Sequence, residues 1–229
     1  MGGNFRPGLI ALGADSFAHK SMPADALLFL SSHCPHCPAM LRGLGELLKR
    51  GVIGRLEAVN LEVWPDAGVA LGVRSVPWLR LGPFVLTGAR ASVELETWAR
   101  RAESPAGMAD ALHELLKTGD LPQVLDLVSR DATRLAALLP IVANPEASMN
   151  VRVGAGAVLE EYAGSTVLAS LVPELGALTR HADARVRADA CHYLGLSRQA
   201  EARMWIESCL ADTSTEVREI AAEALENLG

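Results

Sequence analysis

The chain has 229 residues, half of them apolar, which is enough material for one large hydrophobic core or two of ordinary size. Its 27 aspartate and glutamate residues outnumber its 21 lysine and arginine residues, and the net charge is -6. A nucleic-acid-binding surface, which needs clustered positive charge, is therefore not expected. Four cysteines are too few for a disulfide scaffold.

The apolar segments and the N-terminus indicate where the chain resides. No apolar run approaches the roughly 20 residues that cross a bilayer, so no membrane contact is expected. The apolar stretch at residues 9–14 is too short and too broken by glycine for a signal peptide, and no basic segment precedes it. We therefore expect a cytoplasmic protein.

Strand-like and helix-like segments alternate up to about residue 103. Gly82 and Pro83 predict a tight turn that joins an antiparallel pair, and Ser92 is the expected N-cap of the next helix, with Glu94 close behind it. The order β-α-β-α-β-β-α predicts a small mixed sheet with helices on both faces. Strands are expected at 26–31, 55–61, 76–81 and 84–87, and helices at 37–49, 65–71 and 92–101.

Cys34 and Cys37 stand two residues apart, after an expected strand and before an expected helix. This order places Cys34 at a helix N-terminus, where unpaired N–H groups and the helix dipole favour a thiolate. The thiolate carries out disulfide exchange, so the motif predicts redox chemistry. Zinc needs four ligands, and no second CxxC or CxxH follows. His33 and His36 are candidate supplementary ligands, but we expect no metal or other cofactor; a cluster shared between two chains stays an alternative.

A second motif, Val76-Pro77, stands directly before a predicted strand. Together with the CxxC pair and the alternating elements, it makes residues 24–102 resemble a thioredoxin-fold domain. The resemblance implies a cis Pro77 facing the cysteine pair and a Val76 backbone that can pair with an extended substrate segment. It also implies that Cys34 is the nucleophile and Cys37 the resolving thiol. Pro35 would stiffen the turn, and His36 would lower the pKa of Cys34.

The motif is not that of an ordinary thioredoxin. Cys34-Pro35-His36-Cys37 resembles the oxidising DsbA family, and the Cys-Pro-x-Cys-Pro pattern resembles glutaredoxins and glutaredoxin-like protein disulfide oxidoreductases. Leu28 stands where many thioredoxins carry a buried acid, and Ala58 where they carry its lysine partner. Efficient thioredoxin-type reduction is therefore not expected. Gly88-Ala89 lacks the double glycine of glutaredoxins, so glutathione binding is unsupported.

From residue 104 the strand signals stop and a repeat appears. The segments 150–159, 185–194 and 216–225 each contain a Val-Arg pair, with alanine four residues after the valine and leucine eight after it. These offsets lie on one helical face. The pattern resembles HEAT or HEAT-like repeats, whose stacked helix pairs build the core; a generic helical bundle is the alternative. Less regular helices at 108–117, 122–129 and 133–142 are expected to begin the stack.

The arginines of the repeat, the two remaining cysteines and the tryptophans are mostly expected to have structural roles. Arg152, Arg187 and Arg218 recur with the repeat and should form an internal ladder with nearby acids. Cys191 and Cys209 suit small core residues, with a resolving or regulatory role left open. Trp78 either borders a substrate groove or packs against the sheet. Packing roles are also expected for Trp64, Trp98 and Trp205.

These observations predict a two-domain protein, with a thioredoxin-like α/β domain at 1–103 and an all-α HEAT-like domain at 104–229. The expected function is thiol–disulfide exchange with a protein partner that the repeats bind. The alternative is a non-catalytic thioredoxin-like adaptor, or an assembly chaperone for a redox protein. The direction of electron flow does not follow from these residues.

Overall fold

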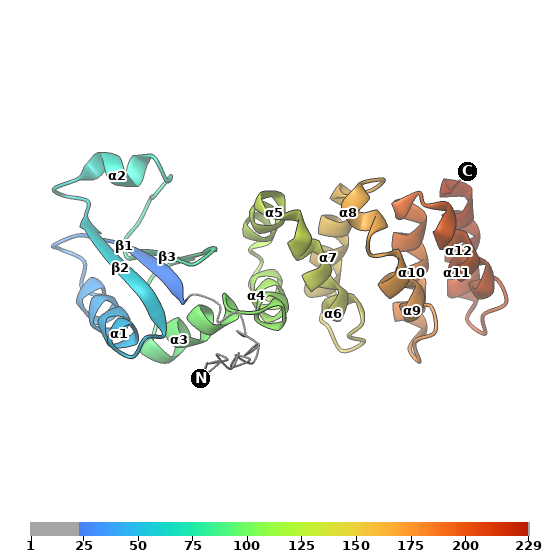
Figure 1. Cartoon of the computed structure of the whole chain (residues 1–229), viewed down its shortest axis with the longest axis horizontal. Coiled ribbons are helices and arrows are strands. Elements are labelled where there is room, and N and C mark those ends of the chain that lie inside the picture. Colours follow the sequence, from blue (N-terminus) through green and yellow to red (C-terminus); the bar gives the residue numbers. More distant parts are fainter. Residues whose placement is uncertain (1–22, 229) are drawn as a thin grey trace, which may run out of the picture.

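A computed structural model describes residues 23–228. A small sheet with its helices occupies one end of the molecule, and a row of helices extends from it to the C-terminus (Figure 1). The expectations for the N-terminal segment before Pro23 lie outside the described residues.

The sheet contains β1 (Ala24–Leu30), β2 (Ile53–Asn60), β3 (Trp78–Leu81) and β4 (Phe84–Thr87) in the order β2-β1-β3-β4. β1 and β2 are parallel because helix α1 (Cys37–Lys49) connects them, while β1–β3 and β3–β4 are antiparallel. Gly82 makes the turn before β4 with φ +55°. The mixed sheet is therefore confirmed. β3 begins at Trp78 and not at residue 76, since Pro77 has no N–H for a strand ladder.

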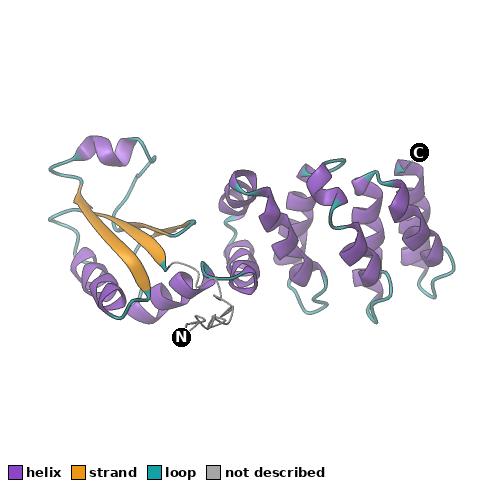
Figure 2. Ribbon diagram, in the orientation of Figure 1, coloured by secondary structure: helices purple, strands orange, loops and turns teal. Residues whose placement is uncertain are grey.

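Helices α1 and α3 (Ser92–Arg101) lie on one side of the sheet, and the short α2 (Pro65–Val69) lies on the other (Figure 2). Leu44 of α1 and Leu95 of α3 are fully buried, in one core with Leu28 of β1. The prediction that Ser92 caps α3 is wrong. Ser92 is the first helical residue, Ala91 is the N-cap, and the Glu94 carboxylate accepts the Ala91 N–H at 2.8 Å.

The rest of the described chain is helical. Residues 133–142 do not form one α-helix: a 3₁₀ helix (Ala132–Leu138) leads into a short α6, because Pro140 fits only the first turn of a helix. The helices are α4 (Pro105–Lys117), α5 (Leu121–Arg130), α6 (Leu139–Val142), α7 (Met149–Glu161), α8 (Thr166–Ala169), α9 (Val172–Leu178), α10 (Ala184–Ser197), α11 (Arg203–Cys209) and α12 (Thr215–Asn227), with a 3₁₀ turn at Ala200–Ala202.

The three aligned segments fall in α7, α10 and α12, which stand in succession along the row (Figure 1). In each, the valine and the alanine four residues later are buried. Gly195 lets α10 approach α12, since a Cβ there would lie 2.8 Å from the Cβ of Ala224. The repeat pattern therefore predicted the packing face of each helix correctly.

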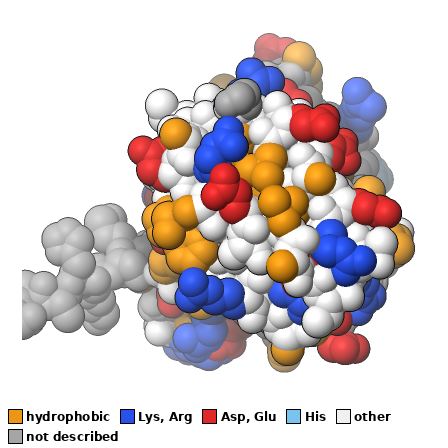
Figure 3. All heavy atoms as spheres, turned by 90° about the vertical axis from the view of Figure 1, so that its right-hand side faces the viewer, with side chains coloured by type: hydrophobic (Ala, Val, Ile, Leu, Met, Phe, Trp, Pro, Cys, Tyr) orange, Lys and Arg blue, Asp and Glu red, His pale blue; other side chains and the backbone are white. Residues whose placement is uncertain are grey.

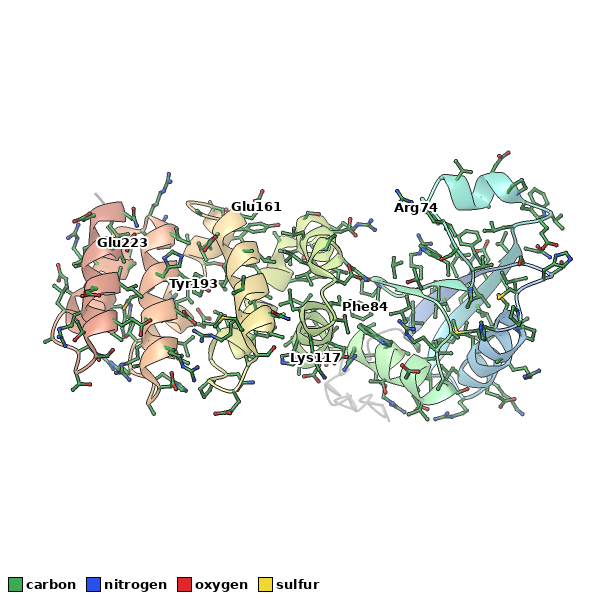
Figure 4. All side chains as sticks on the ribbon, turned by 180° about the vertical axis from the view of Figure 1, so that it is seen from behind. Arg74, Phe84, Lys117, Glu161, Tyr193 and Glu223 are labelled. Carbon is green, nitrogen blue, oxygen red and sulfur yellow. A yellow bond between two sulfur atoms is a disulfide. The ribbon has the colours of Figure 1, made fainter. Side chains whose placement is uncertain are left out.

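One polar contact ties the helical part to the sheet. The Gln123 side chain of α5 accepts the Val85 N–H at 2.6 Å and donates to the Val85 carbonyl at 3.0 Å. It thus occupies the outer edge of β4 as a neighbouring strand would, which satisfies backbone groups that an edge strand leaves open. Phe84, labelled in Figure 4, stands in the same region and packs edge-on against Trp98 at 5.1 Å.

Candidate redox site

The cysteine pair lies where β1 ends and α1 begins. Cys37 is the first residue of α1, and Pro38 follows it in the first turn, a position that tolerates proline because its N–H would have no partner there. Cys34 and Cys37 form a disulfide, with their Cα atoms 5.5 Å apart; Figure 4 shows the bond in the sheet part of the molecule. Cys37 is buried and Cys34 half-buried, so Cys34 is the more accessible sulfur.

The backbone around Cys34 favours negative charge on its sulfur. The Cys37 N–H donates a hydrogen bond to Cys34 Sγ at 3.1 Å. This donor belongs to the first residue of a 13-residue helix, where the helix dipole adds positive potential. A thiolate released at Cys34 by reduction would therefore find a donor already in place. His36, the expected tuning residue, is exposed and forms no side-chain capping hydrogen bond.

Asn60 at the end of β2 and Glu62 just after it hold the turn that precedes Cys34. The Glu62 carboxylate accepts the Ser32 N–H at 3.1 Å and contacts His33 Nδ1 at 2.9 Å. Asn60 donates to the Ser32 hydroxyl at 3.0 Å and accepts the Glu62 N–H at 2.9 Å. The hydrogen bond to Glu62 raises the pKa of His33, and the same contact lowers the pKa of Glu62.

Asn60 and Glu62 are site residues that no motif in the sequence indicates. A signal was nevertheless available. Asn60 ends the strand that runs parallel to β1, and it pairs in register with Leu30. The ends of parallel neighbouring strands meet at the same edge of a sheet, so polar residues after β2 should lie near the turn after β1.

Val76 and Pro77 lie at the same edge. Trp78 pairs in register with Phe29 of β1, which brings the two preceding residues towards the end of β1. The Val76–Pro77 peptide bond is cis. Val76 is half-buried and Pro77 is buried. The role of Val76 in binding a substrate segment stays a prediction.

The tryptophans divide into packing and exposed residues. Trp78 is buried and packs on Phe29, with ring centroids 5.4 Å apart, so it is a sheet-face residue and not part of a groove. Trp98 is also buried. The expectation of packing is wrong for Trp64, which is 68% exposed, as is Val63. They are the two residues after Glu62, so apolar surface lies next to the turn that carries Cys34.

The arginine ladder is present for two of its three members. Arg152 of α7 donates to Asp189 of α10 at 2.7 Å, and Arg187 of α10 binds Asp212 through two bonds of 2.7 and 2.8 Å. Each pair joins one repeat to the next. Arg218 differs, because it donates to the Asp212 and Thr213 carbonyls instead of to an acid of a following helix.

Comparison with known families agrees with the repeat pattern. Residues 135–226 match the family described as HEAT repeats, a range that includes all three Val-Arg segments. No curated protein matches the chain. Between residues 23 and 228, no set of three or more His, Cys, Asp and Glu side chains is arranged to hold a metal ion. Over the same residues, every helix is too short or too polar to cross a membrane. The C-terminal part of this protein thus carries HEAT-like repeats, preceded by a small mixed four-stranded sheet.

Proposed function

We propose that this chain is a thiol–disulfide oxidoreductase that acts on a protein partner through Cys34 and Cys37. In this proposal the sheet part is a thioredoxin-like domain, the boundary lies near residue 103, and the HEAT-like repeats bind the partner. One observation carries the proposal: the two sulfurs are paired at the start of α1, and the more accessible one receives a backbone hydrogen bond at 3.1 Å.

The exchange would proceed through a mixed disulfide. A thiolate of the partner attacks Cys34 Sγ, the Cys34–Cys37 bond breaks, and Cys37 leaves as a thiolate that takes up a proton. A second partner thiolate then attacks the mixed disulfide, which releases Cys34 and oxidises the partner by two electrons. In the reverse direction Cys34 attacks a partner disulfide and Cys37 resolves it. The unequal burial of the two cysteines supports these separate roles.

The surroundings of the pair favour the oxidising direction. Stabilising the Cys34 thiolate stabilises the reduced form, which makes the disulfide a stronger oxidant. Leu28 is fully buried in the core at the position where many thioredoxins place an acid. Without a carboxylate there, Cys37 lacks the internal proton acceptor that assists thioredoxin-type reduction.

The repeats offer a surface on which a partner could bind. A groove of about 540 Å³ lies along α7, α10 and α12. Arg152, Asp189 and Tyr193 line it, and the exposed Met149 and Val153 stand at the same place. Apolar side chains flanked by charges are typical of protein interfaces. The end face of the row also presents apolar side chains among charged ones (Figure 3).

The match to HEAT repeats also favours a second candidate, a non-catalytic adaptor or assembly chaperone for a redox protein. Such repeats provide extended binding surfaces without any chemistry. In that case the cysteine pair would be dispensable for partner capture. The two candidates therefore differ in what loss of Cys34 and Cys37 does to binding.

A trapping experiment separates them. Cys37→Ser leaves Cys34 able to attack but removes the resolving thiol, so the oxidoreductase should accumulate a mixed disulfide that dithiothreitol releases. Cys34→Ser is the matched control and should trap nothing. Equilibration of the unaltered chain in glutathione buffers should show reversible cycling of the Cys34–Cys37 disulfide. If the pair does not cycle and partner capture survives Cys34→Ser/Cys37→Ser, the enzyme proposal fails and the adaptor remains.

A further inference from the structure

Two more thiols meet in the interior of the repeats. Cys191 lies on α10 and Cys209 at the end of α11, and both are buried free thiols. Helices α10 and α11 pack against each other, and both cysteine side chains belong to one hydrophobic core, where the Cys191 thiol donates a hydrogen bond to Cys209. Cys209 Sγ also lies 4.0 Å from the Thr179 carbonyl oxygen, towards which it donates. Both cysteines lie in the core, as their residue type predicts, but no local pattern in the sequence indicates that they meet.

The surroundings of this pair make the two sulfurs unequal. Cys209 accepts a hydrogen bond from Cys191, which lowers the pKa of Cys209 to about 7. Holding that proton, together with burial, raises the pKa of Cys191. Two charged groups act on the pair from the neighbouring turn and helix, Asp212 and Arg187. Asp212 raises the pKa of both thiols and Arg187 lowers that of Cys191, and these two charged side chains form an ion pair with each other.

We propose that Cys191 and Cys209 form a second dithiol site, which a two-electron thiol oxidant of the peroxide class converts into a disulfide. The Cys209 thiolate attacks one peroxide oxygen, the O–O bond breaks, and hydroxide takes up a proton and leaves as water. Cys191 then attacks the sulfur of the resulting sulfenic acid, the S–O bond breaks, and a second water leaves. Two thiols are oxidised by one electron each, and hydrogen peroxide is reduced to two waters.

The bond would join successive repeats. α10 is the second helix of one helix pair, and α11 is the first helix of the next pair. At present the Arg187–Asp212 ion pair makes the corresponding connection without a covalent bond. Oxidation would therefore fix the spacing of these repeats, next to the surface formed by α7, α10 and α12. The burial of both sulfurs restricts the oxidant to a small molecule and excludes direct exchange with a folded protein.

The test uses the full chain with Cys34→Ser and Cys37→Ser, which leaves Cys191 and Cys209 as its only cysteines. The folded, reduced protein is treated with hydrogen peroxide, alkylated, and digested without reductant for mass spectrometry. We expect a linked peptide pair that contains both residues and a mass lower by two hydrogens. The melting temperature should rise on the order of 5 °C, reversibly with dithiothreitol. The unaltered chain is mapped in parallel, where the peptides distinguish this disulfide from Cys34–Cys37.

Single variants of the chain that carries Cys34→Ser and Cys37→Ser test which of the two buried sulfurs reacts with peroxide first. Cys191→Ala should leave a sulfenic acid at Cys209 that dimedone labels, whereas Cys209→Ala should leave Cys191 reduced at the same dose. The proposal is overturned if both thiols of the parent remain alkylatable, or if the linkage appears only once circular dichroism shows unfolding. Because every variant lacks Cys34 and Cys37, the result is independent of the exchange activity proposed above.

Discussion

The two cysteine pairs of this chain differ in almost every respect that sets thiol chemistry. Cys34 is half-buried and lies just before the start of a helix, Cys37 is buried at its first residue, and a backbone N–H stabilises charge on the outer sulfur, that of Cys34. Cys191 and Cys209 lie between packed helices and interact mainly with each other. A sulfur at a helix N-terminus can meet another protein, whereas a sulfur inside a stack meets only its neighbours and small molecules. Position in the fold, more than residue type, thus separates the two proposed roles.

The largest expected effect is the loss of disulfide-exchange activity when Cys34, but not Cys191, is replaced. Cys34→Ser should abolish both the oxidation of a reduced protein substrate and mixed-disulfide formation, because no other thiol of the chain is both accessible and at a helix N-terminus. Cys191→Ala, which shortens a buried side chain far from that turn, should leave both readouts unchanged. Turnover and trapping are measured on both variants after circular dichroism has shown that they fold. If activity were lost in Cys191→Ala and kept in Cys34→Ser, the exchange site would be the buried pair, and the assignment made here would be wrong.

The next prediction concerns the ion pair beside the buried cysteines. The Arg187 and Asp212 side chains are only 13% and 11% exposed. Arg187→Ala should lower the free energy of unfolding by about 3 kcal/mol, because it leaves a largely buried carboxylate unpaired. Urea unfolding measures the change. The matched control is Arg100→Ala, which breaks an exposed pair with Glu96 and should cost about 0.5 kcal/mol or less. Equal losses in the two variants would contradict the structural role of the ladder.

A smaller effect is expected at the contact between the two regions. Gln123→Ala removes both hydrogen bonds to Val85 and should cost about 1–2 kcal/mol, since the strand edge loses its partner. Loss of this tie should also separate the unfolding of the sheet from that of the repeats. Calorimetry on the full chain would detect a second transition. Pro122→Ala, which alters the same turn of α5 but not the contact, serves as the control; a single unchanged transition in Gln123→Ala would show that the tie is unimportant.

The smallest predicted change is in the pKa of His33, in the turn that carries Cys34. Glu62→Gln should lower the pKa of His33 towards its ordinary value of 6.5, because the carboxylate that raises it is gone. The His33–Glu62 attraction is present below the pKa of His33 and is lost as the pH rises through it. An NMR titration of the His33 ring would measure the shift. Glu57→Gln, whose carboxylate pairs with Arg55, should leave the titration of His33 unchanged, and a shift there would argue against the local contact.

Much of the fold was predictable because it depends on local signals. α1, β4 and α3 have the predicted bounds; the turn at Gly82-Pro83 sets the start of β4. β1 begins earlier than predicted, at Ala24, because Ala24 pairs with Ile53 of β2, a contact that no local pattern reveals. The repeat register was predictable for the same reason as α1, since the valine, alanine and leucine offsets are helical offsets.

The residues of the candidate site likewise divide into those that a local motif reveals and those that it does not. Cys34 and Cys37 are neighbours in the chain, so their motif can be recognised from the order of residues alone. Glu62 went unassigned, and Trp64 was wrongly expected to pack, because both depend on how the segment after β2 lies against the turn after β1. Neither position carries a periodic or spacing signal.

The sequence by itself determined the cysteine motif, the order of strands and helices and the period of the repeats, because each is encoded by residues within a turn or two of one another. Only the tertiary structure decided which distant residues meet. Glu62 reaches Ser32 because parallel strands end at one edge, and Cys191 reaches Cys209 because two helices of successive repeats pack together. Such contacts depend on strand register and helix spacing, which are set by the packing of the whole core.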